Sequence, residues 1–151
     1  MDRPFTFKLE RVRALRERKE DLAKEELAAS LALRVRGEAM LRAAADSVEQ
    51  ARGVQRSAAG APMTAAELQA AQAYLERTER ERESASLALD RREAEVDARR
   101  MALQNAARER EVLERLKERR RVEHVREEGR REGAILDEMA ITMHRRAGHA
   151  A

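Results

Sequence analysis

Cysteine and tryptophan are absent from this sequence of 151 residues, which has only one tyrosine, two phenylalanines and two prolines. Without cysteine the chain has no disulfide, no thiolate nucleophile and no cysteine metal site. No apolar stretch approaches the roughly 20 residues that span a bilayer, and the amino-terminal residues lack the apolar core of a signal peptide. We therefore expect a cytoplasmic protein that has no large aromatic core.

What the sequence does contain is charge and small apolar side chains. Charged residues make up 40% of the chain, and the hydrophobic 42% is largely alanine. A long chain rich in Ala, Leu, Glu and Arg with few breakers is typical of a coiled coil or a long helical hairpin. The 32 basic and 29 acidic residues are interleaved, as on a solvated helix surface. This composition also leaves a disordered chain open, because low hydrophobicity favours disorder, and the regular apolar repeat described below favours an all-α protein.

One strong break interrupts the helical pattern. Gly60 is suited to the left-handed conformation that closes a helix, and Pro62 cannot continue that helix. Thr64 and Glu67 have the spacing of a capping box, which begins a new helix. The sequence predicts a single helical hairpin over 1–151: a first helix over about 7–57 capped by Thr6, a turn over about 58–64, a second helix over about 65–145, and a frayed tail over 147–151.

Apolar residues recur at helical spacing on both sides of the break. The predicted stripe of the first helix consists of Phe5, Leu9, Val12, Leu15, Leu22, Leu27, Leu31, Val35, Leu41 and Val48. In the second helix two heptad positions are mostly apolar. The residues at these positions are Leu68, Leu75, Leu89, Val96 and Leu103, and Ala71, Thr78, Ala85, Ala106 and Leu113. Arg82, Arg92 and Arg99 are exceptions in this pattern, which predicts an antiparallel coiled-coil hairpin.

The position of the turn predicts which residues pair. Because both helices rise equally per residue, partners should have numbers that sum to about 122. Val54 would then lie near Leu68, and Phe5 opposite Lys117. Residues from about 117 to 146 would have no partner in the chain. This overhang of about 30 residues would expose an apolar side, which usually marks a partner surface.

No constellation for catalysis, a cofactor or a metal stands out. His124, His144 and His149 lack metal-ligand spacing, and the glycines occur singly. The carboxylates lie on a solvated surface without a pocket to shift their pKa. The run Arg119 to Arg121 is flanked by glutamates and has no interleaved aromatics, which favours a solvated or partner-facing patch over nucleic-acid binding.

Three segments resemble one known family. Residues 5–16, Phe-Thr-Phe-Lys-Leu-Glu-Arg-Val-Arg-Ala-Leu-Arg, resemble the F-x-F-x-L-E-x-V-x-x-L-R start of the bacterial flagellar export protein FliJ family. Residues 113–120 and 136–140 resemble its carboxy-terminal segments. The three occur in the family's order and cover essentially the whole chain.

The resemblance implies a non-catalytic stalk and adaptor of the flagellar type III export apparatus, and hence a role in flagellum biogenesis, motility and chemotaxis. It would be an antiparallel two-helix coiled coil that couples the hexameric export ATPase to the cytoplasmic domain of the export gate protein FlhA. It would also bind export chaperones. Such a protein is cytoplasmic and peripherally associated with the inner face of the cell membrane at the flagellar base.

The resemblance also implies two sets of contact residues. The expected contacts with the ATPase ring are Phe5, Leu9, Leu116, Arg119, Arg120, Leu136 and Met139. The expected contacts with the export gate are Tyr74, Thr78, Glu81 and Ala85, beside Met40 and Ala44.

Two alternatives stay open. One is the equivalent stalk of a virulence-type secretion system, against which the Phe-x-Phe start argues. The other is a parallel dimeric coiled coil that serves as a structural rod, against which the Gly-Pro break and its capping box argue.

Overall fold

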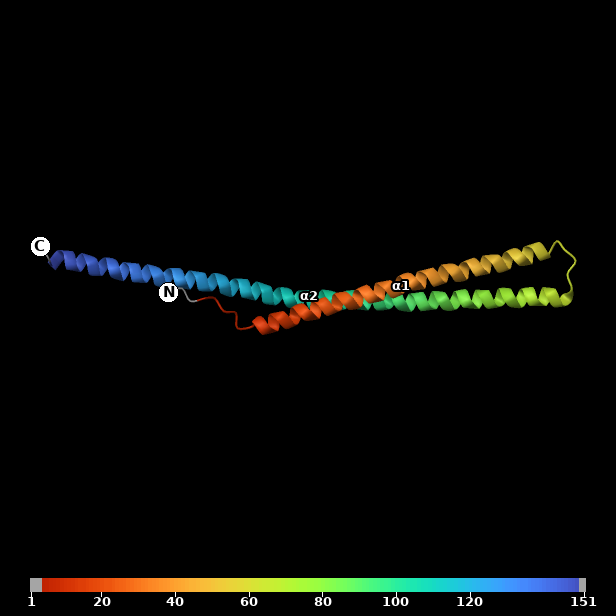
Figure 1. Ribbon diagram of the computed structural model, residues 1–151, viewed down its shortest axis with the longest axis horizontal. Coiled ribbons are helices and arrows are strands. Elements are labelled where there is room, and N and C mark those ends of the chain that lie inside the picture. Colours follow the sequence, from red (N-terminus) through yellow and green to blue (C-terminus); the bar gives the residue numbers. More distant parts are fainter. Residues whose placement is uncertain (1–3, 150–151) are drawn as a thin grey trace. The chain divides into compact units, whose positions relative to one another are not determined.

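The computed structural model describes residues 4–149, and within this range the only regular elements are two α-helices. Helix α1 spans Glu10–Ala58 and helix α2 spans Ala65–His149 (Figure 1). The protein is therefore an all-α helical hairpin. The chain divides into two compact units: unit 1 comprises Met1–Lys19 and Ala106–Ala151, and unit 2 comprises Glu20–Asn105. Helix α2 continues to His149, where a frayed tail was expected from 147, and the last two residues of that tail lie outside the described range.

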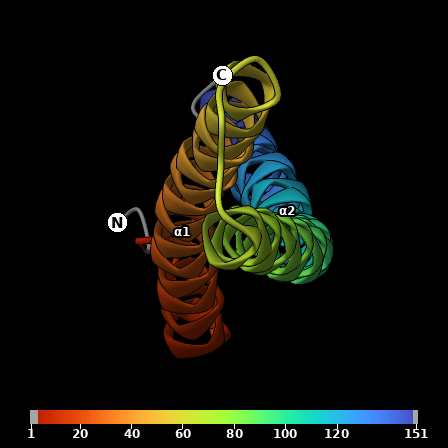
Figure 2. The ribbon, with the colours of Figure 1, turned by 90° about the vertical axis from the view of Figure 1, so that its right-hand side faces the viewer.

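The loop over 59–64 reverses the chain in unit 2 (Figure 2). The backbone N–H of Ala59 donates to the carbonyl of Gln55, and that of Ala61 donates to the carbonyl of Ala58, both at 3.1 Å. The expected left-handed conformation of Gly60 is wrong, because no glycine of the described range has a positive φ. A tight turn that uses the last carbonyls ends α1 instead.

The predicted capping box is confirmed at the start of α2. The backbone N–H of Thr64 donates to the Glu67 carboxylate at 2.8 Å, and the backbone N–H of Glu67 donates to the Thr64 hydroxyl at 3.3 Å. The Thr64 hydroxyl donates to the same carboxylate at 2.9 Å. These bonds satisfy amides that would otherwise lack partners in the first turn.

Small side chains, rather than leucines, form most of the α1 face that packs against α2 in unit 2. The buried residues of α1 are Glu20, Ala23, Ser30, Gly37, Val48 and Ala51. Ala23, Ser30, Gly37 and Ala51 fall in one series with a spacing of seven residues. The predicted leucine-rich stripe was wrong at several positions, since Leu22 is 55% exposed. Small residues leave room for the backbones to approach, and the larger side chains are displaced to the flanks.

The predicted heptad pattern describes α2 better than α1. Val96 and Thr78 are buried, and Leu75 and Leu89 are half-buried. The Thr78 hydroxyl donates to the carbonyl of Leu75 at 2.9 Å, which satisfies this polar group inside the interface. Leu68 departs from the pattern and is exposed.

The two helices run antiparallel in unit 2, but in a different register from the one expected. Arg99 forms an ion pair with Glu26 at 2.7 Å, whereas a sum of 122 would place it beside Ala23. The expected contact between Val54 and Leu68 is wrong too, since both side chains are more than half exposed. The first turn of α2 lies beyond the end of α1 (Figure 1), which shifts every later partner toward the end of the chain.

In unit 1, the start of α1 runs antiparallel to α2. Arg13 forms an ion pair with Glu114 at 2.8 Å, and Arg16 with Glu109. Helix α1 begins at Glu10, later than the expected start near Phe7, and Thr6 makes no capping bond in the described range. Within residues 4–149, neither helix contains a segment with the length and apolarity that crossing a membrane requires.

Candidate functional site: the amino-terminal segment and the end of α2

The amino-terminal segment, residues 4–9, lies against α2 in unit 1 without forming a helix. Together with α2 it lines a groove of about 570 Å³ that extends from Leu116 to Arg131. The ring of Phe5 meets the ring of His124 edge to face, with centroids 5.7 Å apart and planes at 67°. An extended chain spans about 3.3 Å per residue against 1.5 Å in a helix, so this short segment reaches far along α2.

Because the amino-terminal segment extends so far along α2, the predicted overhang of about 30 uncovered residues is wrong. Phe5 was expected opposite Lys117, but Lys117 pairs with Glu10 at 3.0 Å, and Phe5 lies on His124. The segment's groove continues to Arg131. Among residues 4–149 of unit 1, the part of α2 that the amino-terminal segment leaves uncovered therefore begins near residue 132 instead of 117, and it is about half as long as expected.

Ion pairs fix the start of α1 on α2. Arg13 bridges Glu10 at 2.7 Å and Glu114 at 2.8 Å, and Lys117 reaches the second oxygen of Glu10. The hydrogen bonds from Arg13 and then from Lys117 hold the pKa of Glu10 below its ordinary value. The hydrogen bonds to Glu10 and Glu114 raise the pKa of Arg13. These charges set the position from which residues 4–9 extend.

Most of the residues predicted to contact the ATPase ring fall into two groups. The first group lines the groove of the amino-terminal segment and consists of Phe5, Leu9, Leu116 and Arg120. The second group, Leu136 and Met139, lies further along α2 and is 65% and 58% exposed. Arg119 is exposed and does not line the groove.

Residues 134–143, here called the C-terminal apolar segment, carry exposed apolar side chains on several sides of α2. Ile135, Leu136, Met139, Ile141 and Met143 are all more than half exposed. At about 100° per residue, these five spread over about 220° of the helix circumference. Our prediction missed Ile135 and Ile141, because it followed one stripe and these two lie outside it. The signal was present as seven apolar residues among ten.

The residues predicted to contact the export gate lie in unit 2. Tyr74 is 36% exposed, and the guanidinium of Arg77 lies 5.3 Å from its ring centroid. Arg77 also pairs with Glu81 at 3.9 Å. Met40 on α1 is 62% exposed.

Not all of that set is available to a partner. Thr78 is 3% exposed and lies inside the helix interface, so it supports the surface and does not form it. Ala44 and Ala85 are half-buried. Of the six predicted residues, Tyr74, Glu81 and Met40 are the exposed ones.

The comparisons with known proteins bear on both units. The family described as flagellar FliJ protein matches residues 5–149. The chain belongs to this family. No curated protein and no solved structure matches the chain. The FliJ match includes the amino-terminal segment, both helices and the C-terminal apolar segment, so the protein is a flagellar protein associated with export.

The described part of this FliJ family member offers no metal site, because no three histidine or carboxylate side chains gather there. The histidine that contacts another ring, His124, packs on Phe5. The groove of unit 1 is lined by acidic and basic side chains around a few apolar ones.

Proposed function

We propose that this protein is a non-catalytic stalk and adaptor of flagellar type III export, which couples a hexameric export ATPase to the export gate and binds export chaperones. It would act in the cytoplasm, peripherally associated with the membrane at the flagellar base. In this role the whole chain would act as a single hairpin. Membership of the FliJ family supports the flagellar assignment.

The C-terminal apolar segment is the observation that carries this proposal. Exposed apolar side chains usually mark a partner surface. Leu136 and Met143 lie on one side of the helix and Ile141 on another, and each is more than half exposed. A flat partner surface would cover one side only. The central opening of a ring covers a helix from all sides, which fits the distribution of these side chains.

The second contact would be made by Tyr74, Glu81 and Met40 in unit 2. An amphipathic aromatic with an exposed edge, backed by an arginine, is a common component of protein interfaces. Thr78, Ala44 and Ala85 would hold these three in place by packing between the helices. A Tyr74→Ala variant that binds the gate domain as well as the unchanged chain would remove this contact from the proposal.

The ring contact is tested with three substitutions in the full chain. Leu136→Glu and Ile141→Glu introduce one charge each on different sides of the C-terminal apolar segment, and Val112→Glu does so at an exposed site outside it. Each of the first two should weaken binding to the purified ATPase by about tenfold or more, as for a central interface residue. Val112→Glu should change it less than about twofold. Loss in only one of the first two would indicate a one-sided contact and contradict insertion into a ring.

A structural rod made of two parallel chains is the competing function of another class. The reversal at residues 59–64 and the capping box at Thr64 favour the hairpin. Sedimentation velocity separates the two, because a stable dimer at low micromolar concentration would support the rod. A virulence-type stalk is disfavoured by the flagellar family match.

A further inference from the structure

The amino-terminal segment is attached to α2 by few contacts. Within residues 4–149, no hydrogen bond and no ion pair joins residues 4–9 to α2. The side chains of Phe5 and Phe7 are half-buried, and the Phe5 ring packs on His124. Of the α2 residues that line the groove, only Leu116 has an aliphatic side chain. The others are ionisable: Arg120, Glu123, His124, Glu127, Glu128 and Arg131. Partial burial of two aromatic rings on mostly charged neighbours therefore holds the segment in place.

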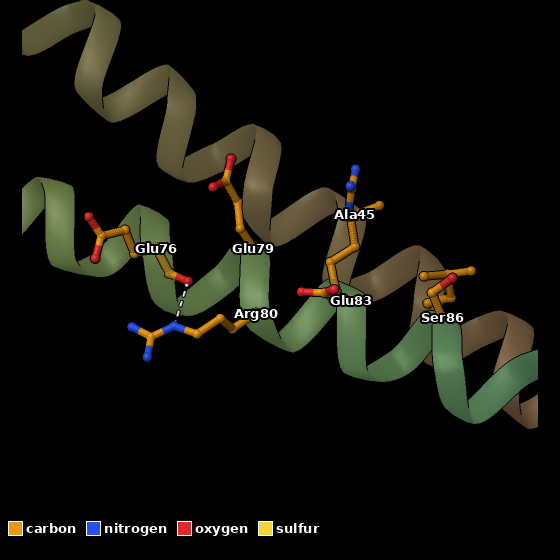
Figure 3. A pocket seen from close by; sticks show the side chains of 8 residues that line it. Ala45, Glu76, Glu79, Arg80, Glu83 and Ser86 are labelled. Atoms are coloured by element: carbon orange, nitrogen blue, oxygen red, sulfur yellow. Dashed lines mark hydrogen bonds between the residues drawn. The ribbon is translucent and has the colours of Figure 1, made fainter.

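The groove of unit 2 has a different construction. Both of its walls are continuous helices (Figure 3), with Ala45 on α1 and residues such as Glu76 and Ser86 on α2. An ion pair between Arg52 of α1 and Glu79 of α2, at 3.1 Å, joins these walls. The groove of unit 1 has the amino-terminal segment as one wall. Because this wall has no hydrogen bond or ion pair to α2 in the described residues, it can leave α2 without breaking a helix.

The position of the segment determines how much of α2 is left uncovered by residues 4–149 of unit 1. With the segment bound, the uncovered part extends from about residue 132 to His149 and is about 27 Å long. Without the segment, it would begin just after Lys117, because the partner of Lys117 is Glu10, the first residue of α1. It would then be about 48 Å long.

We propose that the amino-terminal segment is a releasable strap that controls how far a ring-shaped partner advances along α2. A ring opening surrounds a helix about 10–12 Å wide on all sides, and a segment packed along one side makes α2 wider there. With the strap bound, the ring would stop near residue 131. The inference rests on the proposed function, which supplies the ring, and it adds two insertion depths about 20 Å apart.

The ring itself would favour release of the strap. A partner shifts an equilibrium between two conformations only if it binds one of them better. Leu116 and Arg120, two of the expected ring contacts, line the groove together with the strap. The ring gains these two contacts only after the strap has left, so it binds the released form better.

The test locks and unlocks the strap in the full chain, which has no cysteine of its own. Phe5→Cys/His124→Cys places two thiols where the rings meet, and a short bis-methanethiosulfonate joins them until a thiol reductant removes it. A photo-crosslinking amino acid at Val125, which is 66% exposed and lies outside the groove, reports whether the purified hexameric ATPase reaches the strapped part of α2. The same amino acid at the exposed Thr142 reports entry of the end of α2.

The locked chain should crosslink to the ATPase from Thr142 and not from Val125, and the reductant should restore crosslinking from Val125. Phe7→Ala, which removes one of the two half-buried rings, should strengthen the crosslink from Val125. Val12→Ala, at an exposed apolar residue outside the groove, is the control and should leave it unchanged. Circular dichroism should show the same helicity in all these chains.

Two results would overturn the strap. One is equal crosslinking from Val125 in the locked and unlocked chains, and the other is no crosslinking from Val125 in any chain that crosslinks from Thr142. Both would leave the proposed function standing. A lack of crosslinking from Thr142 in every chain would instead overturn the proposed function, and the strap's control of a ring with it.

Discussion

The guanidinium of Arg92 on α2 donates a hydrogen bond to the backbone carbonyl of Leu33 on α1, at 2.8 Å. Gly37, four residues after Leu33, is buried directly beneath the arginine side chain. A Cβ atom at Gly37 would lie 3.1 Å from Cδ of Arg92 and 3.3 Å from Cδ1 of Leu89. Arg92, which interrupts the heptad pattern, thus forms a hydrogen bond across the helix interface. Its side chain fits there because Gly37 has no side chain.

Two glycines of α1 should respond differently to alanine. Alanine favours a helix over glycine by about 1 kcal/mol, and nothing lies within 4 Å of a Cβ at Gly53. Gly53→Ala should therefore raise the stability of the hairpin by up to about 1 kcal/mol. At Gly37 the crowding by Arg92 and Leu89 should cancel that gain. Thermal unfolding followed by circular dichroism checks both, and equal stabilisation by the two changes would contradict the close packing.

Val96 should be among the most sensitive positions of unit 2. It is 1% exposed, and Val96→Ala removes two methyl carbons from the helix interface. The cost should be about 1–2 kcal/mol, from lost burial plus a small cavity. Val35→Ala, at a position 58% exposed, is the control and should cost much less. Urea denaturation of the two variants measures the difference.

The capping box should make stability depend on pH. The hydrogen bond from the backbone N–H of Thr64, and then that from its hydroxyl, lower the pKa of Glu67 below its ordinary value of 4.5. Because the folded pKa is the lower one, this contribution is fully present above pH 4.5 and is lost as the pH falls through the folded pKa. Thr64→Ala should cost about 0.5–2 kcal/mol at pH 7. The part of the cost that comes from the Glu67 carboxylate should be lost in acid, so a cost that stays constant down to pH 3 would contradict a contribution from that carboxylate.

The ion pairs of unit 1 should also contribute less to stability as the pH falls. The pKa of Glu10 is lowered by Arg13 and Lys117, so the stabilisation it gives is lost as acid protonates the carboxylate. Glu10→Gln should release residues 4–9 from α2 at pH 7. Limited proteolysis near Phe7 reports that release, and Glu118→Gln, whose partner Arg121 is only three residues away on α2, is the control. Identical cleavage of both variants would show that Glu10 does not anchor the segment.

The turn and the capping box could be read from the sequence because they depend on neighbours a few residues apart. The α2 interface could be read in part, because its heptad pattern is regular apart from residues such as Leu68. The α1 interface could not be read by searching for large apolar residues. It is formed by the small residues Ala23, Ser30, Gly37 and Ala51, which recur at multiples of seven residues. Small residues form an interface only where a second helix packs closely on them, and the sequence of α1 alone does not show this. Of the residues predicted to contact the ATPase ring, Phe5, Leu9, Leu116 and Arg120 line one groove, and the exposed Ile135 and Ile141 lie outside the predicted set.

The sequence by itself determined an all-α chain with one reversal at Gly60 to Thr64, because helix periodicity, proline and capping chemistry are local. Tertiary structure decided the register and the covered length of α2. These depend on where the first turn of α2 lies beyond α1 and on an extended segment that places Phe5 on His124. Both are set by packing and ion pairs between residues on different helices, such as Arg99 and Glu26 or Arg13 and Glu114, which helical periodicity does not specify.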